Sequence, residues 1–434
     1  MICRAENAHR RNGEFQMSND EKTIFVYADW LETEPVLVGK SYVSISHANE
    51  VFSFEYSDEW LQKHDEYVAL DPDLSLYAGR QYTPIDKQVF GFLSDSSPDR
   101  WGRLLMKRKE SIAARKESRK PRALTESDFL LGVFDKSRIG ALRLSLAEGG
   151  PFLADKIELS APPWATLRSL ETASLAFETG GDQDEEKWLI QLLAPGSSLG
   201  GARPKASVQA PDGSLWIAKF PSKNDEWNSG AWEMVVHDLA VKCMLNVPEA
   251  KLENFSDNGS TYLVKRFDRL GEKRIHYASA MALLGKTDGR GSDDSSYLDV
   301  ASFIKSNGAH PDNDLIELWK RVVFTIAVSN TDDHLRNHGF ILTDHGWTLS
   351  PMFDVNPNIY GNTLSLNISH NDNTMDIGLA LETAQFYGIG LKEAKEIEKG
   401  ILKTVRDNWR DIASEYGINR NLVKDMEAAF IHSS

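Results

Sequence analysis

A polar segment in the C-terminal half of the chain carries oxygen-bearing side chains at a spacing that suits metal-assisted chemistry. Asp332 and Asn337 are five residues apart, and Asp354 follows Asn337 after seventeen residues. Carboxylate and amide oxygens are suitable ligands for magnesium, and a carboxylate also accepts the proton of a hydroxyl group. The three residues therefore predict a site in which a divalent cation and a general base act at one point.

A predicted β-hairpin would bring these residues together. Two strand-forming segments, 340–343 and 347–349, flank a short turn. In antiparallel pairing, this turn places Asn337 and Asp354 about opposite each other at the open end of the hairpin. Asp332 is one short loop away, so we expect the three side chains to converge.

Two histidines leave a second interpretation of the segment open. His334 and His338 lie among these residues and would serve as ligands in a zinc site. The segment has no HExxH pattern, and the neighbouring groups are mainly hard oxygen ligands, which favour magnesium. A polar loop that caps a helix is the third interpretation. The elements upstream must decide among these alternatives.

A Gly-rich stretch over residues 196–205 is the first upstream element. Small residues such as Gly200, Gly201 and Ala202 let backbone N–H groups approach an anionic ligand closely. The stretch does not match the Walker A pattern, in which Gly-Lys-Ser/Thr opens a helix. On its own it predicts only a loop.

Lys219 and Glu233 follow the Gly-rich stretch in an order that has a known use. Lys219 lies on the strand after the Gly-rich stretch, and Glu233 lies on a predicted helix over residues 230–245. On that strand Trp216 and Phe220 share one face, and Lys219 points to the other. In protein kinases the same order supplies a loop that covers the phosphates, a phosphate-binding lysine and the glutamate that fixes this lysine.

The interval between Asp332 and Asn337 also equals that of the kinase catalytic loop, H-R-D-x-x-x-x-N. In that template the aspartate accepts the proton of the substrate hydroxyl, and the asparagine and a later aspartate, here Asp354, hold magnesium. The phosphates of ATP supply further ligands to the metal. The complete order therefore predicts phosphoryl transfer from ATP.

Composition excludes several other classes of protein. A chain of 434 residues is large enough for two or three domains, and its net charge of −15 argues against general binding to nucleic acid or acidic membranes. Two cysteines are too few for a disulfide framework, which predicts a cytoplasmic location. The longest apolar run, about seven residues, is too short to span a membrane.

One basic stretch departs from the acidic composition. Residues 100–122 include ten lysines or arginines. The stretch is interpreted either as the solvated surface of a helix and loop or as a patch that contacts the phosphates of DNA or RNA.

Local patterns predict the elements that position these motifs. Residues 89–109 have helical spacing, residues 148–164 form a plausible linker, and the final hundred or so residues suit a helical bundle. The polar N-terminal segment, residues 1–19, is expected to be disordered. Short apolar clusters predict the strands of one antiparallel sheet at residues 24–27, 36–38, 42–45 and 51–56.

Taken together, these motifs make the chain similar to the HipA family of serine/threonine kinases, the toxins of bacterial type II toxin–antitoxin modules. The resemblance covers roughly residues 20–410, and residues 76–79 and 90–103 look like that family's N-terminal subdomain. The central motifs that carry it are SLGGARPK at 198–205, IAKFP at 217–221, LNVP at 245–248, VKRFDR at 264–269, TDDHLRN at 331–337 and PMFD at 351–354.

The resemblance implies an α+β, two-lobed, protein-kinase-like fold with a β-rich N-terminal lobe and a mainly helical C-terminal lobe. We expect an extra N-terminal subdomain at residues 20–155. The core of the N-terminal lobe, with its Gly-rich loop, would follow at residues 156–270. The helical lobe with the catalytic loop would occupy residues 271–434.

The resemblance also assigns roles to individual residues. Asp332 would be the catalytic base, and Asn337 and Asp354 would bind magnesium. Lys265 and Phe267 would lie at the hinge that faces adenine, through backbone groups. The residues implied in ATP binding are Gly200, Gly201, Ala202, Lys219, Glu233, Lys265, Phe267 and His334.

The resemblance further implies that Ser198 is autophosphorylated, although the adjacent Ser197 is an alternative. A phosphoserine would add nearly two negative charges beside the ATP phosphates, which explains why this modification is associated with inactivation in the family. Two departures from relatives stand out. Asp333 replaces a glycine and would perturb the pKa of Asp332 or recruit a cation, and the pair at 203–204, Arg-Pro, would change the mobility of the Gly-rich loop.

The implied partners are an antitoxin of the HipB type, which is a helix-turn-helix DNA-binding dimer, and operator DNA bound by the complex. The basic stretch at residues 100–122 would touch DNA in that assembly. The implied substrate is a protein, and aminoacyl-tRNA synthetases are the family's best-known target class. A non-catalytic co-repressor and a small-molecule phosphotransferase remain as alternative functions.

Overall fold

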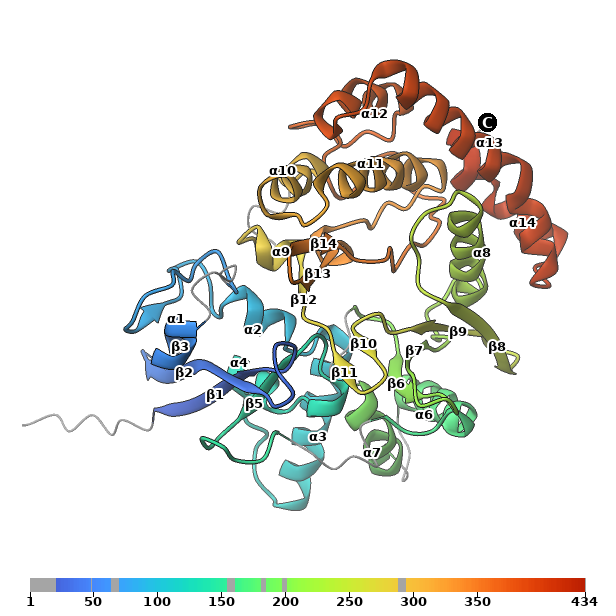
Figure 1. The fold of residues 1–434 in the computed structure, drawn as a ribbon. Helices are drawn as coiled ribbons and strands as arrows, with labels where there is room; N and C mark the ends of the chain where they lie inside the picture. Colours follow the sequence, from blue (N-terminus) through green and yellow to red (C-terminus); the bar gives the residue numbers. More distant parts are fainter. Residues whose placement is uncertain are drawn as a thin grey trace, which may run out of the picture.

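The chain folds into two lobes with an additional N-terminal subdomain beside them (Figure 1). The mixture of antiparallel sheets and helices confirms the predicted α+β class. The expected N-terminal tail, part of the expected linker, Ser197, Ser198 and Gly200 lie outside the residues that the structure describes. This computed structural model describes residues 21–47, 49–63, 70–153, 161–180, 185–196, 201–287 and 294–433.

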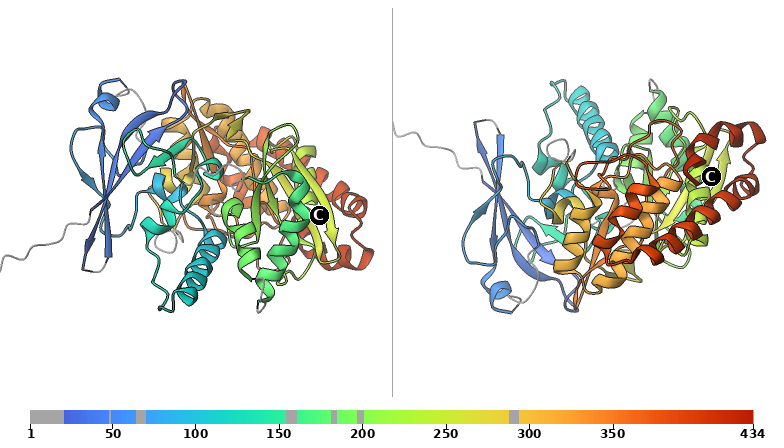
Figure 2. Two further views of the ribbon diagram at one scale, coloured as in Figure 1. Left: turned by 90° about the horizontal axis from the view of Figure 1, so that it is seen from below. Right: turned by 90° about the horizontal axis from the view of Figure 1, so that it is seen from above.

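The N-terminal subdomain is built on a five-stranded antiparallel sheet of order β4-β3-β2-β1-β5. Figure 2 shows this sheet at one end of the molecule, opposite the C-terminal helices. The segments predicted as two strands at 36–38 and 42–45 form the single strand β2, in which a Cβ atom on Gly39 would lie 2.2 Å from the Glu55 carbonyl oxygen. The strands are β1 Lys22–Ala28, β2 Val36–Ser46, β3 Asn49–Tyr56, β4 Gln81–Tyr82 and β5 Leu142–Ser145.

The predicted helix over residues 89–109 is two helices, α2 Gly91–Asp95 and α3 Arg100–Lys116. The sequence encodes the break, because Pro98 disfavours a helical conformation at the residue before it and Asp99 caps the next helix. The Asp99 carboxylate accepts a hydrogen bond from the backbone N–H of Arg100 at 2.8 Å. Two further short helices belong to the subdomain, α1 Asp58–Lys63 and α4 Glu126–Leu131, with a 3₁₀ turn at Asp135–Ser137.

The N-terminal lobe contains a second antiparallel sheet of order β6-β7-β9-β8. As predicted, Trp216 and Phe220 share one buried face of this sheet. Trp101 and Leu105 of α3 belong to the same apolar core, so the N-terminal subdomain packs directly on this lobe. The elements are β6 Lys205–Gln209, β7 Leu215–Lys219, β8 Ala250–Ser256 and β9 Gly259–Lys265, with helices α6 Leu167–Thr179, α7 Glu185–Gly196 and α8 Ser229–Lys242 and a 3₁₀ turn at Trp164–Thr166.

The C-terminal lobe is mainly helical, as predicted, and encloses the largest apolar core. Its buried tryptophans include Trp319 of α11 and Trp409 of α13, and Trp232 of α8 packs against the same core. None of the helices in the described ranges is both long and apolar enough to cross a membrane. The helices are α9 Ala280–Leu283, α10 Tyr297–Asn307, α11 Pro311–Ala327, α12 Ile377–Thr383, α13 Leu391–Glu415 and α14 Arg420–Asp425, with 3₁₀ turns at Leu335–Asn337, Ala384–Tyr387 and Met426–Ser433.

The predicted hairpin forms in this lobe as β13 Gly339–Thr343 and β14 Gly346–Leu349. Thr343 pairs with Gly346 next to the turn, and Phe340 pairs with Leu349 toward the open end. A third strand, β12 Tyr277–Ser279, extends the hairpin into a small sheet. The open end therefore lies next to the segments that carry Asn337 and Asp354.

A short hairpin, β10 Arg269–Leu270 with β11 Lys273–Arg274, follows β9 where the chain crosses between the lobes. The Arg266 guanidinium donates hydrogen bonds to the Asp268 carboxylate at 2.6 and 2.8 Å and to the Arg138 carbonyl at 3.0 Å. Despite its burial, Asp268 has a pKa below its ordinary value, because Arg266 and Arg269 stabilise the ionised carboxylate. These buried contacts fix the crossover to the N-terminal subdomain.

Candidate active site

Lys219 of β7 contacts carboxylates from helix α8 and from the segment that follows the β13–β14 hairpin. Its Nζ lies 2.5 Å from the Glu233 Oε1 of α8 and 2.5 Å from the Asp354 Oδ1 that follows the hairpin. Burial alone would lower the pKa of Lys219, but the two carboxylates outweigh burial and raise it above its ordinary value. Burial raises the pKa of Glu233, whereas Lys219 holds the pKa of Asp354 below its ordinary value despite burial. The arrangement is a buried lysine held between two acids.

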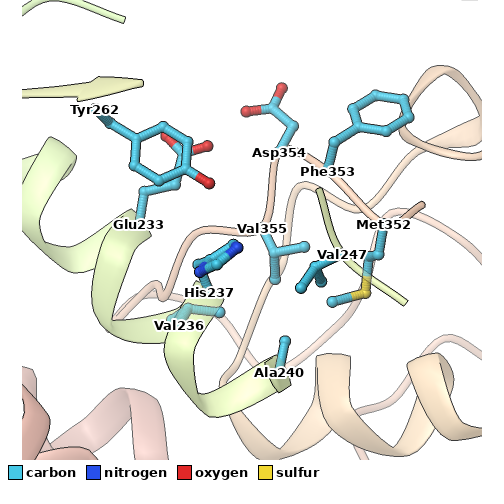
Figure 3. A pocket seen from close by; sticks show the side chains of 10 residues that line it. All are labelled: Glu233, Val236, His237, Ala240, Val247, Tyr262, Met352, Phe353, Asp354 and Val355. Atoms are coloured by element: carbon cyan, nitrogen blue, oxygen red, sulfur yellow. The ribbon is translucent and has the colours of Figure 1, made fainter. Parts of the chain in front are cut away.

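Glu233 and Asp354 of this cluster also line a small pocket, together with several apolar side chains (Figure 3). Glu233 and Tyr262 lie on one side of the pocket, and Phe353 and Asp354 lie on the other. The Lys219 Nζ is 5.8 Å from the centre of the Tyr262 ring, which adds a cation–π contact. Apolar surroundings strengthen the attraction between Lys219 and its two carboxylate partners. The apolar lining residues are Val236, Ala240, Val247, Met352 and Val355.

Lys205 is a second buried lysine at the site that was not among the predicted site residues. It lies directly opposite Lys219 in the pairing of β6 with β7. Burial lowers the pKa of Lys205 to about 8, and the neighbouring charge of Lys219 adds to this effect. A Cβ atom on Gly201 would lie 2.7 Å from its Nζ. Its place at the end of the Gly-rich stretch was the only signal in the sequence. Sequence spacing alone does not reveal that Lys205 pairs with Lys219 across two strands.

The catalytic-loop residues lie beside this cluster. The Asn337 Nδ2 donates a hydrogen bond to the Asp332 carbonyl oxygen at 3.0 Å. This bond uses the amide nitrogen of Asn337 and not its amide oxygen. Burial raises the pKa of the Asp332 carboxyl, and the nearby charges of Asp354 and Asp333 add to the rise. Asp332 is therefore a carboxylate whose proton affinity is higher than usual, as a general base requires.

Two loops that carry these acids are braced against each other. The Asn358 Nδ2 donates to the Thr331 Oγ1 at 2.6 Å, and the Asn356 backbone N–H donates to the Asn330 Oδ1 at 3.3 Å. Asp354 has a φ of 59°, a left-handed conformation that aspartate tolerates better than most residues. The bracing therefore holds Asp354 in a position that the local sequence alone would not specify.

The Asp333 side chain is buried in the interior of the C-terminal lobe. Its Oδ2 accepts a hydrogen bond from the Tyr297 hydroxyl at 2.6 Å, and its Oδ1 lies 3.1 Å from the His338 Nε2. These neighbours hold the pKa of Asp333 below its ordinary value despite burial, with His338 as the largest stabilising influence. Asp333 thus attaches the segment 331–337 to Tyr297 and His338 in the interior. Its charge contributes only part of the rise in the Asp332 pKa.

The two histidines have different surroundings. His338 faces Asp333 in the interior, whereas His334 lies close enough to Asp332 and Asp354 for its positive charge to favour their ionised forms. Among the residues that the structure describes, no group of three or more histidine, cysteine or acidic side chains is arranged to hold a metal ion. The zinc interpretation therefore has no support from these residues.

The oxygens that remain do fit magnesium bound together with ATP. Asp354 uses one carboxylate oxygen for Lys219 and is about one-third exposed, and Asn337 keeps its amide oxygen. Magnesium commonly takes only one or two protein ligands when phosphates supply the others. Two oxygens are therefore enough for this metal, although they are too few for a site made of protein alone.

The predicted hinge residues are only partly directed at the site. The Lys265 backbone N–H donates to the Glu249 carbonyl at 2.8 Å, and its ammonium group lies 3.3 Å from the Glu249 carboxylate, away from the acids. The Phe267 ring lies 5.7 Å from the ring of Phe353, the residue before Asp354. The Phe267 ring thus lies beside the residue before Asp354, whereas the Lys265 side chain pairs with Glu249. A role of these two residues at a hinge through backbone groups remains a prediction.

The described end of the Gly-rich stretch is held firmly. Gly201 has a φ of +83°, which favours glycine, and Ala202 follows it before β6. Arg203 forms a two-bonded ion pair with Asp225, at 2.9 and 2.6 Å. Arginine at this position therefore restrains the loop end. Gly200 and the two candidate phosphorylation sites lie outside the described residues.

Acidic neighbours neutralise part of the basic stretch on α3 and the loop after it. In the part of the chain that the structure describes, several of its cations form ion pairs with carboxylates at 2.5 to 2.6 Å. The field of this surface is therefore weaker than the sequence suggested. The pairs are Arg103–Glu126, Lys116–Glu186, Arg119–Glu110 and Arg122–Asp128.

Comparisons with known proteins agree with this geometry. Residues 197–409 match the family model described as the HipA-like C-terminal domain. "Putative kinase Y4dM" of Sinorhizobium fredii (strain NBRC 101917 / NGR234) is 25% identical over 224 residues, which are 44% of this chain and 54% of that protein, so the match spans about half of the relative.

A solved structure resembles nearly the whole chain. It is the HipA toxin–antitoxin system of Shewanella oneidensis MR-1, in complex with HipB and operator DNA. The TM-score is 0.65, the identity is 15%, and the alignment covers 94% of this chain and 95% of the solved one. At this identity the similarity establishes the fold, including the N-terminal subdomain.

Proposed function

Because this chain carries a HipA-like C-terminal domain within a HipA fold, we propose that it is a kinase that transfers the γ-phosphoryl group of ATP to a serine or threonine hydroxyl of a protein. One observation carries the proposal: Lys219 lies 2.5 Å from Glu233, which is the lysine–glutamate ion pair that a kinase requires, and 2.5 Å from Asp354, the candidate metal ligand. A relative named as a kinase adds support.

Each residue has a defined task in this proposal. Lys219 and Lys205 bind the negatively charged phosphates, and Glu233 keeps Lys219 in place. Asp332 accepts the proton of the acceptor hydroxyl, because its raised pKa gives it more affinity for that proton. Asn337 and Asp354 would hold magnesium, which neutralises charge on the phosphates when bound.

We further propose that the protein is the toxin of a type II toxin–antitoxin module. The fold similarity covers 94% of the chain and includes a protein solved with HipB and operator DNA. The partner would be a helix-turn-helix antitoxin dimer, and operator DNA would be bound through the complex, with the exposed part of α3 closest to it. Ser198 would be autophosphorylated, with Ser197 as the alternative.

The decisive experiment follows radiolabelled γ-phosphate. The purified protein is incubated with labelled ATP, magnesium and a cell extract, and labelled proteins and metabolites are separated and identified. One dominant labelled protein, together with labelled enzyme, supports the proposal. A labelled metabolite would favour the small-molecule phosphotransferase, and ATP binding with no transfer would favour a non-catalytic co-repressor.

The low pKa of Lys205 predicts that ATP affinity depends on pH. Lys205 loses its proton near pH 8, and bound phosphates favour the protonated form, so binding takes up a proton above that pH. We expect the affinity for a non-hydrolysable ATP analogue to fall about fivefold between pH 8 and pH 9. The charges that face Lys205 are those of Asp354, Lys219, Asp99 and Glu233.

Titration calorimetry at pH 7.5, 8 and 9 measures this dependence. Lys205→Gln should bind the analogue more weakly at pH 7.5 and show almost no change up to pH 9. An unchanged slope in Lys205→Gln would mean that another group is responsible.

A further inference from the structure

The first turn of α3 holds the end of the Gly-rich loop by its backbone. The Asp99 carboxylate accepts a hydrogen bond from the Gly201 N–H, and the Trp101 N–H donates to the Gly201 carbonyl oxygen at 3.2 Å. The Trp101 indole N–H donates to the Lys205 carbonyl oxygen at 3.0 Å. Three hydrogen bonds therefore join α3 to the segment between the Gly-rich loop and β6.

The chemistry of a helix start explains why these contacts are strong. The first N–H groups of a helix have no partner within the helix, so the Gly201 carbonyl supplies an acceptor that Trp101 would otherwise lack. The Gly201 N–H and the charge of Arg336 keep the pKa of Asp99 below its ordinary value despite burial, so the bond to Gly201 is charge-assisted. Trp101 is only 1% exposed, and its ring packs edge-on against Phe177.

The position of Gly201 matters for the phosphate site. A Cβ atom on Gly201 would lie 2.7 Å from the Lys205 Nζ, so the loop end and the buried ammonium group are in direct contact. Lys205 in turn faces Lys219 across β6 and β7. A shift of Gly201 would therefore alter the group that we assign to phosphate binding.

We propose that Asp99 and Trp101 are positioning residues of the nucleotide site, through which the N-terminal subdomain sets the affinity for ATP. They fix Gly201 and the start of β6 in the arrangement that receives the phosphates. This inference rests on the proposed ATP-dependent function. It adds that α3, which lies outside the matched HipA-like C-terminal domain at residues 197–409, is part of the nucleotide-binding apparatus.

Asp99→Ser separates this role from helix capping, because serine is also a good helix N-cap but is too short to keep both contacts. We expect its dissociation constant for a non-hydrolysable ATP analogue to rise about tenfold, the usual effect of losing one charge-assisted hydrogen bond. Residue-resolved amide exchange should become faster at Gly201. Trp101→Phe removes the indole donor and also reduces a buried ring, so its free energy of unfolding is measured beside its affinity; we expect its dissociation constant for the analogue to rise about fivefold.

Asp376→Ser is the matched control. Asp376 caps α12 in the C-terminal lobe in the same way, through the Gly378 N–H, and is exposed. This variant should keep wild-type affinity and wild-type exchange at Gly201. The inference is wrong if Asp99→Ser binds the analogue as tightly as wild type does, or if Asp376→Ser loses as much affinity. Failure of the wild-type protein to bind ATP would instead contradict the proposed function.

Discussion

Asp332→Asn is expected to lower the rate of phosphoryl transfer by about 10²–10⁴-fold, because asparagine cannot accept the proton of the acceptor hydroxyl. The substitution preserves the size of the side chain, and the Asn337 amide bonds to the Asp332 backbone rather than to its carboxylate. The affinity for ATP should therefore change little. Labelled phosphate transfer and calorimetric titration of an ATP analogue measure the two quantities separately.

The same variant should be at least as stable as the wild-type protein when nucleotide and metal are absent. The raised pKa of Asp332 means that the folded state binds this proton more tightly than the unfolded state does. At pH values between the pKa of Asp332 in the unfolded state and its pKa in the folded state, the folded state holds more protons. The free energy of unfolding therefore falls as the pH rises through this range. At neutral pH the ionised Asp332 carboxylate thus destabilises the folded state. Removing the charge relieves this cost, as is common at catalytic positions. Near-normal transfer by Asp332→Asn would contradict its assignment as the base.

Lys219→Met is expected to cause the largest combined loss, in stability and in ATP binding. The substitution leaves Glu233 buried and Asp354 partly buried without their cation, and breaking a buried pair such as Lys219–Glu233 costs about 3–5 kcal/mol. Chemical denaturation measures the free energy of unfolding. Titration of an ATP analogue should show no measurable binding at concentrations that saturate the wild-type protein.

The pH dependence of this loss gives a further check. Without Lys219 the two carboxylates repel each other, and Glu233, whose pKa is already raised, should take up a proton first. The deficit in stability should therefore shrink as the pH falls from 7 toward 5. Lys219→Met with Glu233→Gln should recover part of the stability at pH 7, but not ATP binding.

Lys403→Met is the matched control for the loss of a lysine salt bridge. Lys403 forms an exposed pair with Asp407 on α13 at 2.6 Å. Exposed pairs contribute little to stability because solvent screens them, so this variant should remain close to wild type. An equal loss of stability in the two variants would show that the buried position of Lys219 has no special importance.

Local sequence signals predicted most of the elements that position the site. The hairpin after Asn337, the strand with Lys219 and the helix with Glu233 all form where apolar spacing and turn residues indicated. Two predictions, the separate strands at 36–38 and 42–45 and the single helix at 89–109, were wrong. Gly39 does not end β2, because its lack of a Cβ atom allows close pairing, whereas Pro98 and Asp99 do end one helix and begin another.

Contacts across the fold were less predictable. The inward orientation of Asp333 depends on Tyr297, which lies 36 residues earlier on α10. The pairing of the basic stretch with acids depends on side chains from neighbouring elements, such as Glu126 and Glu186. Such contacts have no periodicity in the sequence, so spacing alone gives no indication of them. The domain boundaries at 155 and 270 and the functional roles of individual site residues remain predictions.

The sequence alone determined which chemical groups are present and in which order: a Gly-rich loop, a strand lysine, a helix glutamate, and then an Asp–Asn pair and a later Asp around a hairpin. These features follow from turn chemistry and from the short periods of strands and helices. Only the tertiary structure decided that Lys219 lies between Glu233 and Asp354, 14 and 135 residues away, with Lys205 opposite it. The physical reason is that packing of sheets and helices from separate lobes, rather than local spacing, sets the distances and burial on which charge interactions depend.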